Sequence, residues 1–212
     1  RLLKDANVQT VWLGLESGNE YIRNNIMKKG VSDAQLVNAL QLLGKYGIHV
    51  ITQNIIGVPE ENPERFLDTV RFNAKFNPGD TVLSIFYPYP GTELYEVCSE
   101  RGYLKDRKML KGERTESILE MPDFPRERIE YFFNRFHELI RYEKQRQISS
   151  CMPELDDSNV DDMLKKIKTE SVWPVELGAL KANQPVSRMY GLDRGHAIDR
   201  YYIEKFIASH AG

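Results

Sequence analysis

Three short runs of β-forming residues alternate with helical patterns over the first hundred residues, and this alternation is the strongest constraint on the fold. The β-forming runs are residues 10–15, 49–58 and 81–87. Amphipathic segments separate them, the first at residues 32–46 and the second beginning at Asn62. Strand and helix therefore alternate up to about Gly102. This pattern predicts an α/β fold with a parallel sheet.

The ends of the two helices between the strands are marked by capping residues. Ser32 and Gln35 have the spacing of a capping box, and Gly47 follows the end of the same segment. Asn62 and Pro63 supply an N-cap and a first-turn proline for the second helix. Both helices are therefore predicted from local signals as well as from periodicity.

Beyond Gly102 the pattern changes. Residues 105–116 are highly charged and are interpreted as a surface loop. Residues 126–147 form a strong amphipathic helix whose aromatic stripe we interpret as core. A proline and acidic run at residues 149–159 predicts a linker or boundary.

Composition excludes several classes of protein. Hydrophobic residues make up 41% and charged residues 28%, which is the balance of a globular chain. A net charge of -2 gives no electrostatic footprint for nucleic acid. No apolar run approaches the roughly 20 residues that span a bilayer, and no charged and apolar leader opens the chain. We therefore expect a cytoplasmic protein with no membrane or nucleic-acid partner.

The two cysteines, Cys98 and Cys151, lie far apart and have no CxxC-type neighbour. This spacing excludes a zinc ribbon or a local cluster loop built from this chain alone, and we interpret both as free thiols. The sequence begins with Arg1 in what looks like the end of a helix, so we expect a fragment.

All three predicted strands end in unusual loops, namely GLESGNE, NIIGVPEEN and IFYPYPGTELYE. In parallel α/β folds the carboxyl ends of the strands form the site, because helices cover the faces and only these loops are free to vary. The coincidence of three such loops is the main indication of function.

In the first loop, Ser17 and Glu20 have the spacing of a capping box, which explains both residues without a ligand. That interpretation leaves Glu16 unexplained. A carboxylate at a strand end needs donors or water, because burying it without partners is costly. Sugar hydroxyls are one set of donors, and Lys28 or Lys29 is another.

The second and third loops permit close approach to a flat ligand. Gly57 lets a backbone or ligand come near, and Pro59 stiffens the exit from the strand, although an ordinary turn explains both equally well. Pro88 and Pro90 prevent continuation of the ladder, so the local carbonyls and the N–H of Tyr89 stay available to contact the edge of a base.

Taken together, the three loops resemble the radical SAM superfamily, specifically the group whose members often contain a cobalamin-binding domain ahead of the barrel. The resemblance covers residues 1–104 and implies the C-terminal half of a partial (βα)6 TIM-like barrel. We then expect a loop and helical extension at 105–148, a linker region at 149–184 and the start of a methyltransferase-like domain at 185–212.

The resemblance implies an S-adenosylmethionine site. Glu16 and Ser17 match the ribose-binding strand end, and Lys28 or Lys29 falls where a basic residue meets the methionyl carboxylate. The family pattern GxIxGxxE is matched by Ile55, which is expected against adenine, and by Gly57 and Glu60, whereas Gln53 replaces the first glycine. The third loop matches the segment whose backbone contacts the adenine amino group, here Tyr87, Pro88 and Tyr89.

The family also has a CxxxCxxC loop, whose three thiolates hold a [4Fe-4S] cluster, and this sequence has no such loop. We therefore expect the chain as given to be inactive as an oxidoreductase or methyltransferase. The resemblance implies a small-molecule or natural-product substrate, and an electron donor such as flavodoxin or ferredoxin. A cobalamin domain upstream would extend the chemistry to methylation of an unactivated carbon.

Other interpretations stay open. Residues 185–207 resemble the lead-in of certain class I S-adenosylmethionine-dependent methyltransferases, and an amphipathic helix at 198–207 is the alternative. The half-barrel as a whole could be a non-catalytic module that binds a nucleotide or a partner. A phosphate-binding (βα) enzyme is a third hypothesis, but no loop combines glycine-lined N–H groups with a lysine in the phosphate-loop manner.

Overall fold

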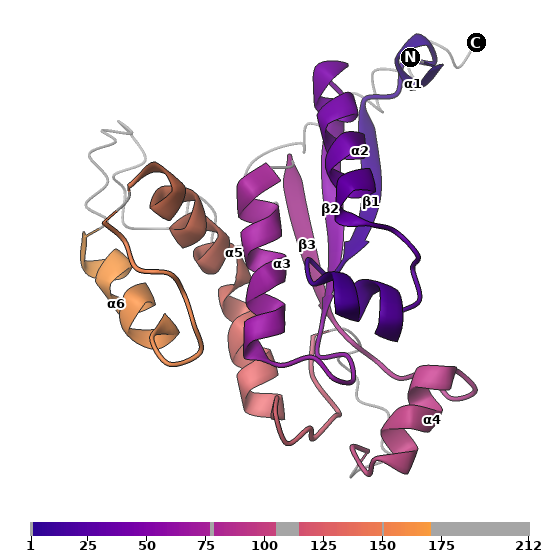
Figure 1. Cartoon of the computed structure of the whole chain (residues 1–212), viewed down its shortest axis with the longest axis vertical. Coiled ribbons are helices and arrows are strands. Elements are labelled where there is room, and N and C mark those ends of the chain that lie inside the picture. The colour runs from indigo at the N-terminus through magenta and orange to yellow at the C-terminus, as the bar shows by residue number, and fades with distance from the viewer. Residues whose placement is uncertain (1, 77–78, 105–114, 150, 171–212) are drawn as a thin grey trace, which may run out of the picture. The chain divides into compact units, whose positions relative to one another are not determined.

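Three parallel strands form the centre of the fold (Figure 1), in a computed structural model that describes residues 2–76, 79–104, 115–149 and 151–170. The strands are β1 (Thr10–Glu16), β2 (His49–Ile56) and β3 (Asp80–Ile85), in the order β1-β2-β3. Both neighbouring pairs are parallel. The structure thus confirms an α/β fold with a parallel sheet.

Short and long helices connect and flank the strands. They are α1 (Leu2–Asp5), the π-helix η1 (Ile22–Ile26), α2 (Asp33–Lys45), α3 (Pro63–Phe76), α4 (Glu93–Glu100), α5 (Arg126–Ile148) and α6 (Val160–Glu170). In Figure 1, α2 and α3 lie in front of the sheet. No helix in the described ranges is both long and apolar enough to cross a lipid bilayer.

The caps predicted for α2 and α3 are confirmed. The Ser32 hydroxyl accepts from the Gln35 N–H, and the Gln35 side chain accepts from the Ser32 N–H in return. The Asn62 carboxamide oxygen accepts from the Arg65 N–H at 2.9 Å, and Pro63 begins the helix. These ends form from contacts within a few residues, which is why sequence alone locates them.

The capping box predicted for Ser17 and Glu20 is wrong. The first turn after β1 is capped by Asn19, whose side-chain oxygen accepts from the Ile22 N–H at 3.1 Å. Ser17 is buried, and its hydroxyl accepts from the Asn19 N–H at 3.2 Å and lies 3.4 Å from the Thr69 hydroxyl of α3. Tertiary contact with α3 therefore determines the orientation of Ser17.

The main hydrophobic core lies between the sheet, α3 and α5. The Phe66 ring lies 5.4 Å from Phe132 and 5.9 Å from Phe136, measured between ring centroids. These three side chains are almost fully buried, so the aromatic stripe of α5 belongs to the core, as predicted. On the opposite face of the sheet, Trp12 and Val82 are 58% and 40% exposed.

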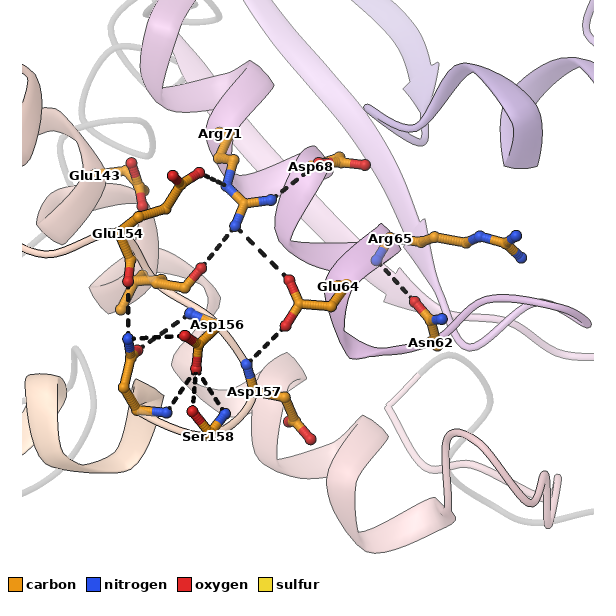
Figure 2. A network of polar contacts seen from close by, with 12 residues as sticks. Asn62, Glu64, Arg65, Asp68, Arg71, Glu143, Glu154, Asp156, Asp157 and Ser158 are labelled. Carbon is orange, nitrogen blue, oxygen red and sulfur yellow. Dashed lines mark hydrogen bonds and ion pairs between the residues drawn. The ribbon is translucent and has the colours of Figure 1, made fainter.

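Of the segment predicted as a linker at residues 149–184, the part up to residue 170 contains α6 and a turn that contacts α3, and residues 171–184 lie outside the described residues. Figure 2 shows the polar contacts that hold this turn. The Arg71 guanidinium donates to the Leu155 carbonyl at 2.6 Å and pairs with Asp68 at 3.0 Å and with Glu154 at 3.2 Å. Leu155 and Val160 are fully buried. The acidic, proline-containing run at residues 153–159 therefore forms a turn that contacts α3, and Arg71 neutralises part of its charge.

The close approach of the first loop to α3 generates a testable prediction. A Cβ atom added at Gly18 would lie 2.4 Å from the Asp68 carbonyl oxygen, and the Gly18 N–H donates to the Thr69 hydroxyl at 2.9 Å. Gly18→Ala should therefore lower the free energy of unfolding in urea by roughly 1–3 kcal/mol. Gly44→Ala is the control, because Gly44 is exposed in α2 with nothing within 4 Å. It should be neutral or stabilising by up to about 1 kcal/mol, and equal stability of the two variants would contradict the prediction.

Candidate functional site

A pocket of about 340 Å³ lies at the carboxyl ends of all three strands. Its volume is within the range of small-ligand sites. Its walls come from each of the three loops singled out in the sequence, and the lining residues are Glu16, Gln53, Asn54, Ile55, Ser84, Ile85, Phe86, Tyr87 and Tyr89. Four predicted site residues, Glu16, Ile55, Tyr87 and Tyr89, thus meet in one cavity.

Glu16 owes its position to an irregularity at the end of β1. The pairing with β2 shifts register between Gly14 and Glu16, and Glu16 has a φ of 62°. A left-handed backbone is costly for a residue with a side chain, and such residues concentrate at functional sites. The carboxylate lies over Gly14, where an added Cβ would be 2.6 Å from Glu16 Oε1. Gly14 therefore leaves the space that this carboxylate occupies.

The two predicted lysines lie in different surroundings. Lys29 Nζ is 2.9 Å from Glu16 Oε1, and the side chains are 42% and 15% exposed. Lys28 pairs instead with Glu93 at 2.5 Å on the surface. Because Lys29 contacts the carboxylate of the pocket, it is the basic residue that the structure brings to the site.

Ser17 and Gly57, also predicted site residues, support the loops from beneath. Ser17 faces α3 and does not line the pocket. Gly57 has a φ of 84°, and an added Cβ would lie 3.1 Å from the Ile129 side chain of α5. Gly57 is therefore required by the left-handed turn and by close packing on α5.

Glu60 links the second loop to Tyr21, just after the first loop, and to the end of α4, and it does not line the pocket. Its carboxylate accepts from the Tyr21 hydroxyl at 2.6 Å and pairs with Arg101, just past α4, at 2.7 Å. Hydrogen bonds from Tyr21 and Arg101 hold the pKa of Glu60 below its usual value, and the bond to Glu60 raises the pKa of the Tyr21 hydroxyl. Arg65 also stacks on the Tyr21 ring, 4.8 Å from its centroid.

The neighbouring acid, Glu61, was not singled out by the sequence. It is buried, and its Oε2 accepts from the Gly57 N–H at 2.6 Å. Burial raises its pKa to about 8, although hydrogen bonds from the Gly57 and Val58 backbone oppose the rise. Its Oε1 has no hydrogen-bond partner in the described part of the chain. Glu60 and Glu61 are consecutive acids after a glycine turn, and the local sequence did not indicate which side chain would be buried.

The third loop presents aromatic rings and backbone groups to the pocket. The Tyr87 and Tyr89 rings lie 5.0 Å apart, with Tyr87 nearly buried and Tyr89 exposed. The Tyr89 carbonyl, which we predicted to stay available, accepts from the Thr92 hydroxyl at 2.8 Å. Over the residues that the structure describes, the Tyr87 carbonyl and the Tyr89 N–H have no protein partner. Pro88 lies between them and enforces the extended geometry.

Arg23, a buried residue of η1, was also not predicted from the sequence. Its guanidinium donates to the carbonyls of Ser17 and Val31 at 2.7 and 2.8 Å and pairs with Asp33 at the start of α2 at 2.5 Å. Arginine in a polar-looking helix is usually exposed, so no sequence pattern indicated this burial.

A second pocket, of about 310 Å³, lies at the amino end of β3 against α5. Its lining includes Asp80 and Thr81 of the strand and the basic side chains of His137, Arg141 and Lys144. None of the predicted site residues lines it.

Comparison with known proteins finds a family model that matches the first part of the chain. Residues 1–72, which include β1, β2 and the whole first loop, match the family model of the radical SAM superfamily. This part of the chain is therefore similar to the radical SAM superfamily. This confirms the resemblance stated from the three loops.

Two known proteins are similar to parts of this chain. An uncharacterized methyltransferase of Pyrococcus horikoshii is 29% identical over 129 residues, which cover 61% of this chain and 28% of that protein. A putative methylthiotransferase of Methanocaldococcus jannaschii is 30% identical over 95 residues, covering 45% of this chain and 21% of that protein. The matches thus span about a quarter of the length of these relatives. Residues 185–212, for which we predicted a methyltransferase-like start, lie outside the described residues.

The described residues do not fit an iron–sulfur cluster. A cluster needs three or four thiolates, whereas the sequence has only Cys98 and Cys151. Cys98 is buried, and burial raises its pKa to about 11, which favours the protonated thiol. Within the described ranges, no three His, Cys, Asp or Glu side chains are grouped to hold a metal.

The buried carboxyl of Glu61 predicts a pH-dependent stability. Its pKa rises on folding from the ordinary 4.5 to about 8, so the folded state binds more protons than the unfolded state between these values. The stability contributed by protonated Glu61 is therefore lost as pH rises through this window. Glu61→Gln cannot ionise, so its free energy of unfolding should rise relative to the parent chain by up to about 1.4 kcal/mol per pH unit. Urea denaturation from pH 5 to 8 measures this, and a difference that does not change with pH would contradict burial of a titrating carboxyl.

Proposed function

We propose that this chain forms the nucleoside-binding part of a radical SAM enzyme that binds S-adenosylmethionine at the carboxyl ends of β1, β2 and β3. The observation that supports this most directly is the convergence of Glu16, Ile55 and Tyr87 on one pocket. Each comes from a different strand or strand end. The similarity of residues 1–72 to the radical SAM superfamily suggests the class of ligand, and the pocket supplies groups complementary to it.

The pocket offers a separate contact for each part of adenosine. The Glu16 carboxylate is an acceptor that can bind both hydroxyls of a ribose. Ile55 gives an apolar surface for the adenine ring. The Tyr87 carbonyl can accept from the adenine amino group, and the Tyr89 N–H can donate to a ring nitrogen. These two backbone groups have no protein partner in the described chain, which leaves them available for a base.

Lys29 suits the amino-acid end of the ligand. Its ammonium group has three donors, and only one is needed for the contact with Glu16 at 2.9 Å. A ligand carboxylate next to the ribose could therefore share Lys29 with Glu16. Lys28, which pairs with Glu93 on the surface, is less suited to this role.

We further propose that cysteines outside these 212 residues hold the [4Fe-4S] cluster of the complete enzyme. That cluster would supply the electron for cleavage of S-adenosylmethionine in the complete enzyme. The described residues of this chain bind and orient the nucleoside. The names of the two relatives support methyl or methylthio transfer as the reaction. Cobalamin, a small-molecule substrate and a flavodoxin-type or ferredoxin-type electron donor stay predictions.

Binding is tested with S-adenosylmethionine and the 212-residue chain by isothermal titration calorimetry. Glu16→Gln keeps the shape of the side chain but removes its charge, and we expect about tenfold to hundredfold weaker binding, as for the loss of a charged hydrogen-bond acceptor. Asp80→Asn is the matched control, because Asp80 is a carboxylate at the opposite end of the same sheet, paired with His49. Equal affinity of Glu16→Gln and the parent chain would contradict the proposed site.

Catalysis is tested separately, on the complete protein that contains this sequence. After anaerobic reconstitution with iron and sulfide, reduction in the presence of S-adenosylmethionine should yield 5'-deoxyadenosine, with less product in Glu16→Gln at equal cluster content. A folded protein that binds S-adenosylmethionine but holds no cluster and forms no product would favour the non-catalytic binding module.

A further inference from the structure

Arg23 lies next to the end of β1, in an unusual helical segment. The π-helix η1 (Ile22–Ile26) contains it, and π turns are rare and frequent at functional sites. The Arg23 side chain is only 1% exposed. A buried charge is costly unless it is paired and hydrogen-bonded, so the position of Arg23 needs an explanation beyond packing.

The guanidinium connects the two ends of the segment between β1 and α2, residues 17–32. Nη1 donates to the carbonyl of Ser17, the residue that directly follows Glu16. Nε donates to the carbonyl of Val31, two residues after Lys29. The backbone takes part as well, because the Lys29 N–H donates to the Arg23 carbonyl at 3.0 Å. Arg23 thus holds the chain next to both members of the Glu16–Lys29 ion pair.

Closing the loop does not by itself require this arginine. Asn24 already joins the two sides, since its side chain accepts from the Val31 N–H at 2.9 Å and donates to the Val31 carbonyl at 3.1 Å. What Asn24 does not contact is Ser17. The contact specific to Arg23 is therefore the one at the end of β1, where the strained backbone of Glu16 must be held.

We propose that Arg23 is a positioning residue for the nucleoside pocket, which it does not line. By donating to the Ser17 carbonyl, the Arg23 guanidinium holds the backbone next to Glu16 and so directs the Glu16 carboxylate, with its partner Lys29, toward the pocket. This inference rests on the proposed function, because it concerns the same pocket.

The test compares Arg23→Gln with Arg71→Gln. Both parent arginines donate to a backbone carbonyl and pair with carboxylates, but Arg71 holds the 153–159 segment on α3, away from the pocket. Both substitutions should lower the thermal midpoint. At a temperature where both variants are folded, we expect Arg23→Gln to bind S-adenosylmethionine about tenfold more weakly and Arg71→Gln to bind within about twofold of the parent. Equal losses in the two variants would overturn the proposal.

A double-mutant cycle separates positioning from general destabilisation. If Arg23 acts through Glu16, then Arg23→Gln should cost less than about twofold in affinity when Glu16→Gln is already present. The same loss in both backgrounds would show that Arg23 does not act through Glu16.

A ligand-independent measurement distinguishes failure of this inference from failure of the proposed function. Absence of S-adenosylmethionine binding by the parent chain would count against the function. Amide hydrogen exchange then tests Arg23: the Gly18 amide, which belongs to the same peptide group as the Ser17 carbonyl and donates to the Thr69 hydroxyl, should exchange faster in Arg23→Gln, with β2 unchanged. An unchanged Gly18 amide would overturn the positioning role.

Discussion

Parallel pairing of three strands is the constraint on which the rest of the structure depends. Because β1, β2 and β3 run in the same direction, their carboxyl ends lie along one edge of the sheet, and the three loops that follow must share that edge. The register shift before Glu16 then directs one carboxylate over Gly14 and into the shared space. A pocket between the loops follows from this topology.

Charged groups beneath or beside the pocket hold the loops in place. Arg23 secures the first loop, Glu61 binds the backbone of the second at Gly57, and Glu60 links Tyr21 to Arg101. Most of the charged side chains described at this end of the sheet therefore hold the loops in position, and few of them line the cavity itself. That division suits a site that must orient a flexible nucleoside with a small number of contacts.

The parts of the fold that were predictable depend on contacts between near neighbours in sequence. The caps at Ser32 and Asn62 are such features, and the meeting of the loops follows from the predicted parallel topology. Ser17 and Glu60 were harder, because contacts from Thr69 and Arg101, distant in sequence, decide where their side chains point. The same applies to α6, since Arg71 on α3 neutralises an acidic turn that looks like a linker.

The most direct test of the central claim is to titrate the isotopically labelled 212-residue chain with S-adenosylmethionine and follow backbone amide signals by NMR. Two pockets of similar volume lie at opposite ends of β3 in the described part of the chain, so the pattern of shifts distinguishes them. We expect the amide signals of Glu16, Ile55 and Tyr89 to shift. Shifts confined to Thr81 and His137 at the other end, with Glu16 and Ile55 unaffected, would contradict a nucleoside site at the carboxyl ends of the strands.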